Sequence, residues 1–241
     1  MPRFYCPGPL STGSELTLPA SAAHHVQVLR LGPGDEITLF NGAGGTFAAR
    51  VAQVEKKRVT VTIGAFADAE LELPYAVTLA QGLPEALKMD WIIEKAVEIG
   101  VASIQPLSAQ RCVVRLSADR AEKKHAHWQG IIVAASEQCG RNRLAQLAAL
   151  ADFGNWVRQP REAPLLLLSP RTTTSLSDWA RQLPPQNVVL AVGPEGGFTL
   201  AEEETALASG AQAVGMGPRV LRTETAGLAA VAALNGIWGA M

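Results

Sequence analysis

The sequence VVLAVGPEGGFTLAEEE, residues 188–204, contains the strongest indication of the fold. Its first five residues are all apolar, which is typical of a strand buried on both faces of a parallel sheet. A glycine-rich turn follows, and Thr199 and Glu202 then have the spacing of a capping box that begins a helix. Ligands of parallel α/β sheets bind beyond the carboxyl ends of strands, where glycines let a ligand approach the backbone closely. The stretch therefore predicts an α/β fold with a ligand-binding loop at 193–197.

Two further stretches also run from a strand into a turn. In GMGPRVLRTETA, residues 215–226, Thr223 is the expected N-cap of the last helix, and Glu224 lies in its first turn, where the helix dipole favours a negative charge. Ser169-Pro170-Arg171 follows the apolar run Leu165–Leu168. The three loops together predict one pocket. Two alternatives stay open for the separate loops, namely an ordinary glycine-rich turn and an exposed ion pair at a helix start.

The remaining sequence divides into two patterns. After residue 74, strands and helices alternate as in an α/β fold, with strands expected at 76–81, 103–107, 164–168 and 187–192 and helices at 86–99, 119–138 and 175–182. Before residue 70, short strands at 15–18, 35–40, 46–54 and 58–66 and a helix at 21–30 predict a small β-barrel or sandwich. The acidic segment 68–74 ends in proline and is the expected linker. We therefore predict domains at 1–70 and 74–241.

Composition excludes several classes of protein. With 48% hydrophobic and 18% charged residues, the 241-residue chain can bury a sizeable core. The first residues lack the pattern of a signal peptide, and no stretch reaches the roughly 18–20 apolar residues of a membrane span. Cys6, Cys112 and Cys139 fit neither a disulfide framework nor a zinc site, and the histidines have no accompanying ligand cluster. We expect a cytoplasmic protein with no membrane contact and no metal.

Positive charge is concentrated in one part of the sequence. The formal net charge is −1, yet residues 104–143 contain seven basic residues against three acidic ones. A surface that faces phosphates requires such clustering, so the segment predicts an RNA contact. A solvated helical face is the alternative interpretation. The shorter cluster Lys56-Lys57-Arg58 is more typical of a hairpin turn.

The glycine loops resemble the signature loops of a known family. GPEGGF at 193–198, followed by an acidic helix, and LRTETA at 221–226 are similar to those of the 16S ribosomal RNA uridine-N3 methyltransferases of the SPOUT class. Further similarity occurs at Arg3-Phe4-Tyr5, His25–Gly34, Lys88–Gly100, Glu137-Gln138 and Gly140-Arg141. Tyr5 is a mild departure, because a second phenylalanine is common at that position. The resemblance covers nearly the whole chain.

This resemblance implies a fold, a cofactor and partners. The expected fold is an N-terminal PUA-like β-barrel followed by a C-terminal SPOUT α/β domain with a deep trefoil knot. The implied cofactor is S-adenosylmethionine, the implied substrate is 16S ribosomal RNA within the 30S subunit, and the implied assembly is a homodimer. Cofactor-binding residues carried over by motif are Leu168, Ser169, Pro170, Val192, Gly193, Pro194, Glu195, Gly196, Gly197, Met216, Gly217, Leu221, Arg222 and Thr223. RNA-binding residues expected from the motifs and the basic segment are Arg3, Arg30, Lys88, Arg111, Arg115, Arg141 and Arg143.

Two arginines are the candidate catalytic residues. Methyl transfer from a sulfonium is an in-line displacement that depends on positioning, and uracil N3 is a poor nucleophile until its proton is lost or shared. We expect Arg141 or Arg222 to stabilise the developing uracil anion through hydrogen bonds to its carbonyl oxygens. Arg222 lies in a cofactor loop, and Arg141 lies in a family motif. The sequence does not identify a general base.

Three alternatives compete with this interpretation. One is a SPOUT enzyme that methylates transfer RNA or another atom. The second is a non-catalytic RNA-binding assembly factor that has lost the cofactor, although both glycine loops are intact. The third is a phosphate-binding α/β enzyme, which the missing P-loop lysine disfavours.

Overall fold

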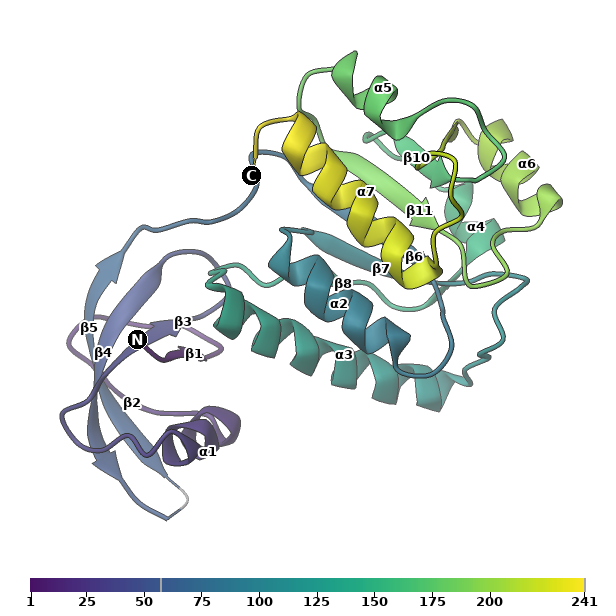
Figure 1. Cartoon of the computed structure of the whole chain (residues 1–241). Coiled ribbons are helices and arrows are strands. Elements are labelled where there is room, and N and C mark those ends of the chain that lie inside the picture. The colour runs from purple at the N-terminus through teal and green to yellow at the C-terminus, as the bar shows by residue number, and fades with distance from the viewer. Residues whose placement is uncertain (57, 241) are drawn as a thin grey trace. The chain divides into compact units, whose positions relative to one another are not determined.

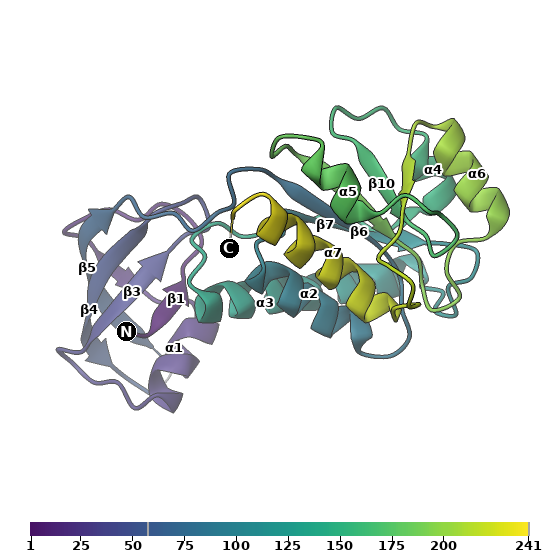
Figure 2. The ribbon, with the colours of Figure 1, turned by 45° about the horizontal axis from the view of Figure 1, so that its top comes forward.

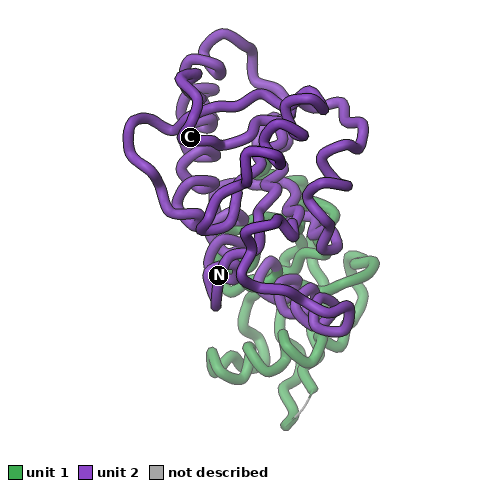
Figure 3. Tube along the Cα trace, turned by 90° about the vertical axis from the view of Figure 1, so that its right-hand side faces the viewer, with its two compact units in different colours: residues 1–72, 133–144 green, residues 73–132, 145–241 purple. Residues whose placement is uncertain are grey.

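The computed structural model describes residues 1–56 and 58–240, and these form two compact units (Figure 3). The first unit contains Met1–Glu72 and Val133–Leu144, and the second contains Leu73–Ile132 and the chain from Ala145 onward. The sequence had assigned 133–144 to the second domain, so this segment is an unexpected part of the first unit. Lys57, in the middle of the basic cluster predicted as a turn, lies outside the described residues.

The first unit is built on a five-stranded sheet and the helix α1 (Ala20–Val28), and it also contains the last residues of the longer helix Ala118–Cys139. The strand order is β1 (Arg3–Tyr5), β3 (Glu36–Phe40), β4 (Thr46–Val54), β5 (Val59–Ala67) and β2 (Glu15–Thr17). β1 pairs with β3 in parallel, and the other pairs are antiparallel. β3, β4 and β5 follow one another both in sequence and in the sheet, as in a β-meander, because neighbouring antiparallel strands can be joined by short turns.

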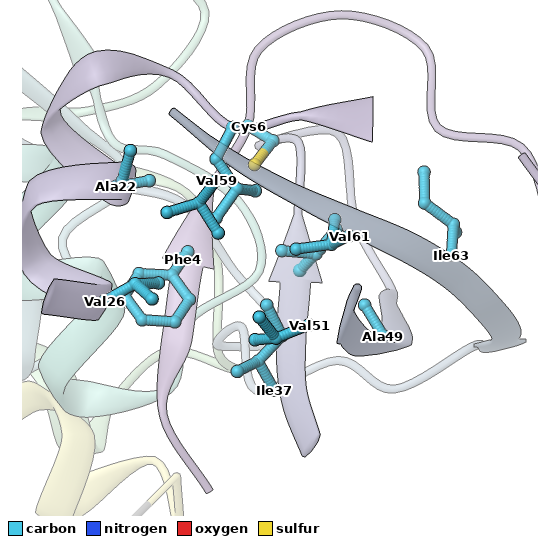
Figure 4. Packing of buried hydrophobic residues seen from close by; sticks show 13 residues of the cluster. Phe4, Cys6, Ala22, Val26, Ile37, Ala49, Val51, Val59, Val61 and Ile63 are labelled. Carbon is cyan, nitrogen blue, oxygen red and sulfur yellow. The ribbon is translucent and has the colours of Figure 1, made fainter. Parts of the chain in front are cut away.

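The core of this unit lies between the sheet and α1, as Figure 4 shows. Alternate residues of β5, namely Val59, Val61 and Ile63, are buried, as the period of a strand with one solvated face requires. Phe4 and Val26 pack into the same cluster and are fully buried. The period-two alternation in the sequence therefore records which face of the sheet is covered.

The second unit contains a seven-stranded parallel sheet. Its order is β12 (Gln212–Val214), β10 (Leu165–Leu168), β11 (Val188–Val192), β6 (Val77–Gly82), β7 (Ser103–Ser108) and β8 (Gln146–Leu147), and β9 (Ala151–Asp152) also pairs with β7. Every residue of β11 is buried, as expected for a central strand covered on both faces. Because the strands are parallel, the loops after β10, β11 and β12 leave the sheet at the same edge.

Helices cover both faces of this sheet. They are α2 (Lys88–Glu98), α3 (Ala118–Cys139), α4 (Phe153–Val157), α5 (Leu176–Arg181), α6 (Leu200–Ala208) and α7 (Thr223–Ile237). α7 packs on β6 and β11 with α2 and α5 on either side (Figures 1 and 2), and α4 packs against α6. α7 approaches the sheet so closely that a Cβ at Gly227 would lie 2.9 Å from the Leu79 Cδ1 atom.

Several details differ from the sequence-based expectations. The prediction of Thr223 as N-cap of α7 is wrong: Arg222 is the N-cap, and Thr223 is the first helical residue. α2 begins at Lys88 rather than at Ala86, because Ala86 has a φ of 52°, outside the helical region. The short elements β8, β9 and α4 had no sequence signal. The trefoil knot stays a prediction.

Candidate active site

A single cavity lies among the loops that follow β10, β11 and β12. Its volume is about 420 Å³, within the range of small-molecule sites. Every residue that the sequence assigned to the cofactor lines this cavity: Leu168, Ser169 and Pro170 from the first loop, Val192 to Gly197 from the second, and Met216, Gly217, Leu221, Arg222 and Thr223 from the third. Three loops distant in sequence thus form one concave surface.

Close backbone contacts shape the glycine-rich loop. A Cβ at Gly82 would lie 2.7 Å from Pro194 Cδ, and a Cβ at Gly193 would lie 2.9 Å from the Gly197 backbone. Gly197 has a φ of 65°, in the left-handed region that favours glycine, and its N–H donates to the Pro194 carbonyl over 2.8 Å. The loop therefore folds tightly on itself and on the end of β6, which leaves its backbone open toward the cavity.

A buried hydrogen-bond chain connects this loop with the start of α7. The Thr223 hydroxyl donates to the Gly193 carbonyl over 2.6 Å. The same hydroxyl accepts a hydrogen bond of 2.8 Å from the side-chain nitrogen of Gln81, which is fully buried at the end of β6. The sequence pattern predicts Gln81 only as the last residue of a strand. A polar residue at the carboxyl end of an otherwise apolar strand was the available signal.

Two ion-pair networks hold the glycine-rich loop in place, and their members Lys88, Arg171 and Glu203 also line the cavity. Lys88 donates to Glu195 Oε1 over 2.6 Å, and the Glu85 N–H donates to the same oxygen over 3.0 Å. Burial acts to raise the pKa of Glu195, but these hydrogen bonds outweigh it and leave the pKa below its ordinary value. Lys88, which the sequence predicts to bind RNA, is therefore engaged with the glycine-rich loop.

The second brace joins the loop after β10 to α6. Arg171 donates to Glu203 Oε1 over 2.6 Å and to the Phe198 carbonyl over 3.0 Å. Glu203 also lines the cavity, and its role was not foreseen from the sequence. The arginine side chain thus holds the end of the glycine-rich loop against the neighbouring loop.

Arg222 differs from these braced residues. Arg222 lines the cavity and is exposed, and its guanidinium has no hydrogen bond or ion pair with the described residues. Arg219 and Val220 lie beside it at the cavity wall, and Val220 is 82% exposed. The cavity therefore has an uncommitted cationic donor at its rim, where a second molecule can approach.

Among the other residues predicted to bind RNA, Arg111 and Arg115 belong to the second unit. Arg111 donates to the Gly196 carbonyl over 2.8 Å, and its side chain packs over that glycine. Arg115 donates to the Gln110 carbonyl over 2.8 Å. Neither arginine lines the cavity, but Arg111 contacts the glycine-rich loop and Arg115 does not.

The remaining predicted RNA-binding residues belong to the first unit. Arg141 is only 4% exposed and forms a two-point ion pair with Glu72, at 3.0 and 2.5 Å. Arg3 donates to Asn142 over 2.6 Å, and Arg143 pairs with Glu70 at 3.4 Å. Arg30 is exposed, with a φ of 56°. None of these four arginines is among the residues that line the cavity.

Residues 1–56 and 58–240 contain neither a cluster of metal ligands nor a membrane-spanning helix. No group of three or more histidine, cysteine, aspartate or glutamate side chains in these ranges is placed to hold a metal ion. In the same ranges, no helix combines the length and the apolar character needed to cross a membrane.

Comparisons with known proteins agree on one family. A family model described as an RNA methyltransferase domain matches residues 71–235, and a model described as an RNA methyltransferase PUA domain matches residues 18–64. The ribosomal RNA small subunit methyltransferase E of Synechocystis is 35% identical, with 92% of this chain and 73% of the relative covered. The enzyme of that name from Bacillus subtilis is 32% identical, with 88% and 86% covered.

Solved structures show the same relationship. A methyltransferase from Legionella pneumophila, solved with bound SAM, has a TM-score of 0.93 and 37% identity, and the alignment covers 97% of this chain and 96% of that one. The ribosomal RNA small subunit methyltransferase E of Neisseria gonorrhoeae, solved with S-adenosyl methionine, has a TM-score of 0.90 and 40% identity, covering 99% and 98%. The α/β fold with an N-terminal PUA domain is thus that of a methyltransferase, and this chain belongs to the ribosomal RNA small subunit methyltransferase E family.

Proposed function

We propose that this protein transfers a methyl group from S-adenosylmethionine to N3 of a uridine in 16S ribosomal RNA. The observation that carries the proposal is the cavity of the second unit, in which the three motif loops converge around an uncommitted arginine. The relatives named ribosomal RNA small subunit methyltransferase E support the substrate, and the related structures solved with the cofactor support the methyl donor.

The residues present fit S-adenosylmethionine. The backbone of the glycine-rich loop borders the cavity without side chains at Gly193, Gly196 and Gly197, and such a cradle suits the edges of an adenine and a ribose. Leu168, Val192, Met216 and Leu221 supply apolar surface for the ring. The bound cofactor supplies an electrophilic methyl group on a sulfonium. The protein's part is to hold that methyl group in line with the acceptor nitrogen.

Arg222 is the residue that we assign to the acceptor. N3 of uracil must lose its proton before it can attack, and the negative charge that develops spreads onto the two adjacent carbonyl oxygens. A guanidinium presents several N–H donors in a fixed plane, which matches such oxygens. Because Arg222 lines the cavity and has no partner in the described chain, it is available for this contact.

For Arg141, the other catalytic candidate, we propose a structural role. Its guanidinium is buried against the Glu72 carboxylate inside the first unit, and a donor engaged in this way is less available to a substrate. Breaking a buried pair of this kind is strongly destabilising, because it leaves one charge without its partner. The pair fastens the segment after α3 to the first unit.

RNA binding and assembly complete the proposal. The target base lies inside folded RNA, so it must be unstacked to reach the cavity. We assign the PUA domain to the flanking RNA, with the 30S subunit as the assembled substrate and the cytoplasm as the place of reaction. We also propose a homodimer, which is supported by two large apolar side chains, Leu87 just before α2 and Trp91 within it, that are 68% and 47% exposed.

Transfer of labelled methyl groups tests this function. The purified protein and labelled S-adenosylmethionine are incubated in three separate reactions, with 30S subunits, with naked 16S RNA and with transfer RNA. We expect labelled 16S RNA, with faster labelling in assembled subunits. Label on transfer RNA alone would keep the enzyme class and change the substrate. Cofactor binding without any RNA labelling would contradict the proposed substrate, and the absence of cofactor binding would favour the assembly-factor alternative.

A further inference from the structure

Gln81 occupies an unusual position beside the cavity. It is the second-last residue of β6, its side chain is fully buried, and it does not line the cavity itself. Its amide nitrogen donates to the Thr223 hydroxyl over 2.8 Å and to the Gly82 carbonyl over 2.9 Å. Because the Thr223 hydroxyl donates onward to Gly193, the central strand, the last helix and the glycine-rich loop are joined by one chain of hydrogen bonds.

We propose that Gln81 is a positioning residue for the methyl donor, which fixes the start of α7 relative to the glycine-rich loop. This inference rests on the proposed function, since the two elements that it joins are two of the three walls of the proposed cofactor cavity. Gln81 acts through Thr223 and Gly193, both of which line the cavity, and touches no reacting atom.

The direction of the hydrogen bonds gives each group a defined part. The Thr223 hydroxyl has one hydrogen, and that hydrogen is committed to the Gly193 carbonyl. Its lone pairs therefore need a donor, which the Gln81 amide supplies. Hydrogen bonds arranged in such a series polarise one another and strengthen. Removal of the Gln81 amide therefore abolishes its hydrogen bond to Thr223 and also weakens the hydrogen bond from Thr223 to Gly193.

Few other polar contacts could hold the start of α7 in place. The N-cap of the helix, Arg222, makes no side-chain capping hydrogen bond. One turn further, Gly227 allows α7 to pack closely on β6 and β11, but a glycine contact does not fix the position of the helix along its own axis. The side-chain hydrogen bonds of Thr223 are therefore the specific anchor at this helix end.

The side-chain oxygen of Gln81 makes it possible to distinguish an effect on cofactor affinity from an effect on the stability of the fold. The Gln81 side-chain oxygen is buried and has no hydrogen-bond partner among the described residues. An unpaired buried oxygen is unfavourable, so an apolar side chain of similar length loses two hydrogen bonds but also removes this cost. We expect Gln81→Met to affect cofactor affinity more than the stability of the fold.

The experiment measures binding of S-adenosylmethionine to the full-length protein by titration calorimetry, with a thermal melt of each variant. Gln81→Met is expected to weaken binding roughly tenfold, the effect expected when the hydrogen bond to Thr223, which connects Gln81 to the cavity wall, is lost. Gln105→Met is the matched control, because the Gln105 amide on β7 also donates two hydrogen bonds, to the carbonyls of Pro106 and Ala149, and Gln105 does not line the cavity. This control is expected to stay within about twofold of the wild type.

A double-mutant cycle with Thr223→Val tests the path. If Gln81 acts through the hydroxyl, Gln81→Met changes affinity by less than about twofold in the Thr223→Val background. Fully additive effects would contradict the path. Unchanged affinity of a folded Gln81→Met protein, when the wild type binds, would overturn the inference and leave the proposed function intact. A wild type that does not bind the cofactor would overturn both.

Hydrogen exchange provides a test that does not depend on the cofactor or on one variant. In the cofactor-free protein, amides of residues 195–197 are expected to exchange about tenfold faster in Gln81→Met and in Thr223→Val, because the loop loses its link to β6. If Gln81→Met does not fold, Thr223→Val alone breaks the same contact from the helix side. Wild-type exchange of the loop in the folded variants would overturn the inference.

Discussion

Replacement of Gly82 by alanine is expected to displace the glycine-rich loop from its position over β6. The added Cβ would lie 2.7 Å from Pro194 Cδ and 2.8 Å from Pro194 N, distances that real Cβ atoms essentially never show. The contact to Cδ must lengthen by about 0.7 Å to reach 3.4 Å, where ordinary van der Waals contact begins. Backbone and a rigid ring form the other side of this contact, so no flexible side chain can absorb the shift. Overpacking of this kind costs roughly 1–3 kcal/mol.

The displaced loop should also bind the methyl donor poorly. Because the displaced loop forms one wall of the cavity, we expect S-adenosylmethionine affinity to fall about tenfold in Gly82→Ala. Methyl transfer should fall further, since a misplacement approaching 1 Å can reduce catalysis by about a hundredfold. Calorimetric titration and a thermal melt measure the effects on affinity and stability. Gly130→Ala on α3 is the control, since no atom lies within 4 Å of its added Cβ, and it should gain roughly 0.5–1 kcal/mol of stability from helix propensity. Wild-type affinity and stability in Gly82→Ala would refute the steric argument.

Three further substitutions test other parts of the site. Arg222→Ala should lower methyl transfer in single-turnover assays by about a hundredfold and leave cofactor affinity within about threefold, and equal losses in both would contradict a role toward the acceptor. The pKa of Glu195 is lowered in the folded protein from its ordinary value of 4.5. The ion pair with Lys88 therefore contributes its full stabilisation above pH 4.5. This stabilisation is lost as the pH falls through the lowered pKa. Melts of Glu195→Gln and wild type should therefore differ at pH 7 and converge in acid, and a constant difference would argue against the pair. Arg141→Ala should lower the free energy of unfolding by about 3 kcal/mol, whereas removal of Glu72 as well should restore part of it, as chemical denaturation would show.

The cavity was predictable because its residues follow short-range rules. The apolar run at 188–192 and the glycines after it specify a buried strand and a tight turn, and the capping box of Thr199 and Glu202 forms as expected. The carboxyl ends of parallel strands share one edge, which is why three loops distant in sequence meet. The spacing of apolar residues also distinguished the mainly antiparallel sheet of the first unit from the parallel sheet of the second.

Other features depend on contacts between distant segments, and the sequence pattern alone did not indicate them. Thr223 has the side chain of an N-cap, but its hydroxyl is bound to Gly193, and the helix begins one residue earlier in the backbone than that side chain suggests. Arg141 looks like an RNA contact until its partner Glu72, far away in sequence, is known. The segment 133–144 continues a helix of the second unit, and only packing assigns it to the first.

The most direct test of the account is to identify the methylated nucleoside. After reaction of the protein with S-adenosylmethionine and 30S subunits, nuclease digestion and mass spectrometry of the 16S RNA locate the new methyl group. The account predicts N3-methyluridine at one position and its near absence with Arg222→Ala. A methyl group on another atom, or on another base, or an equal yield with the variant would contradict it.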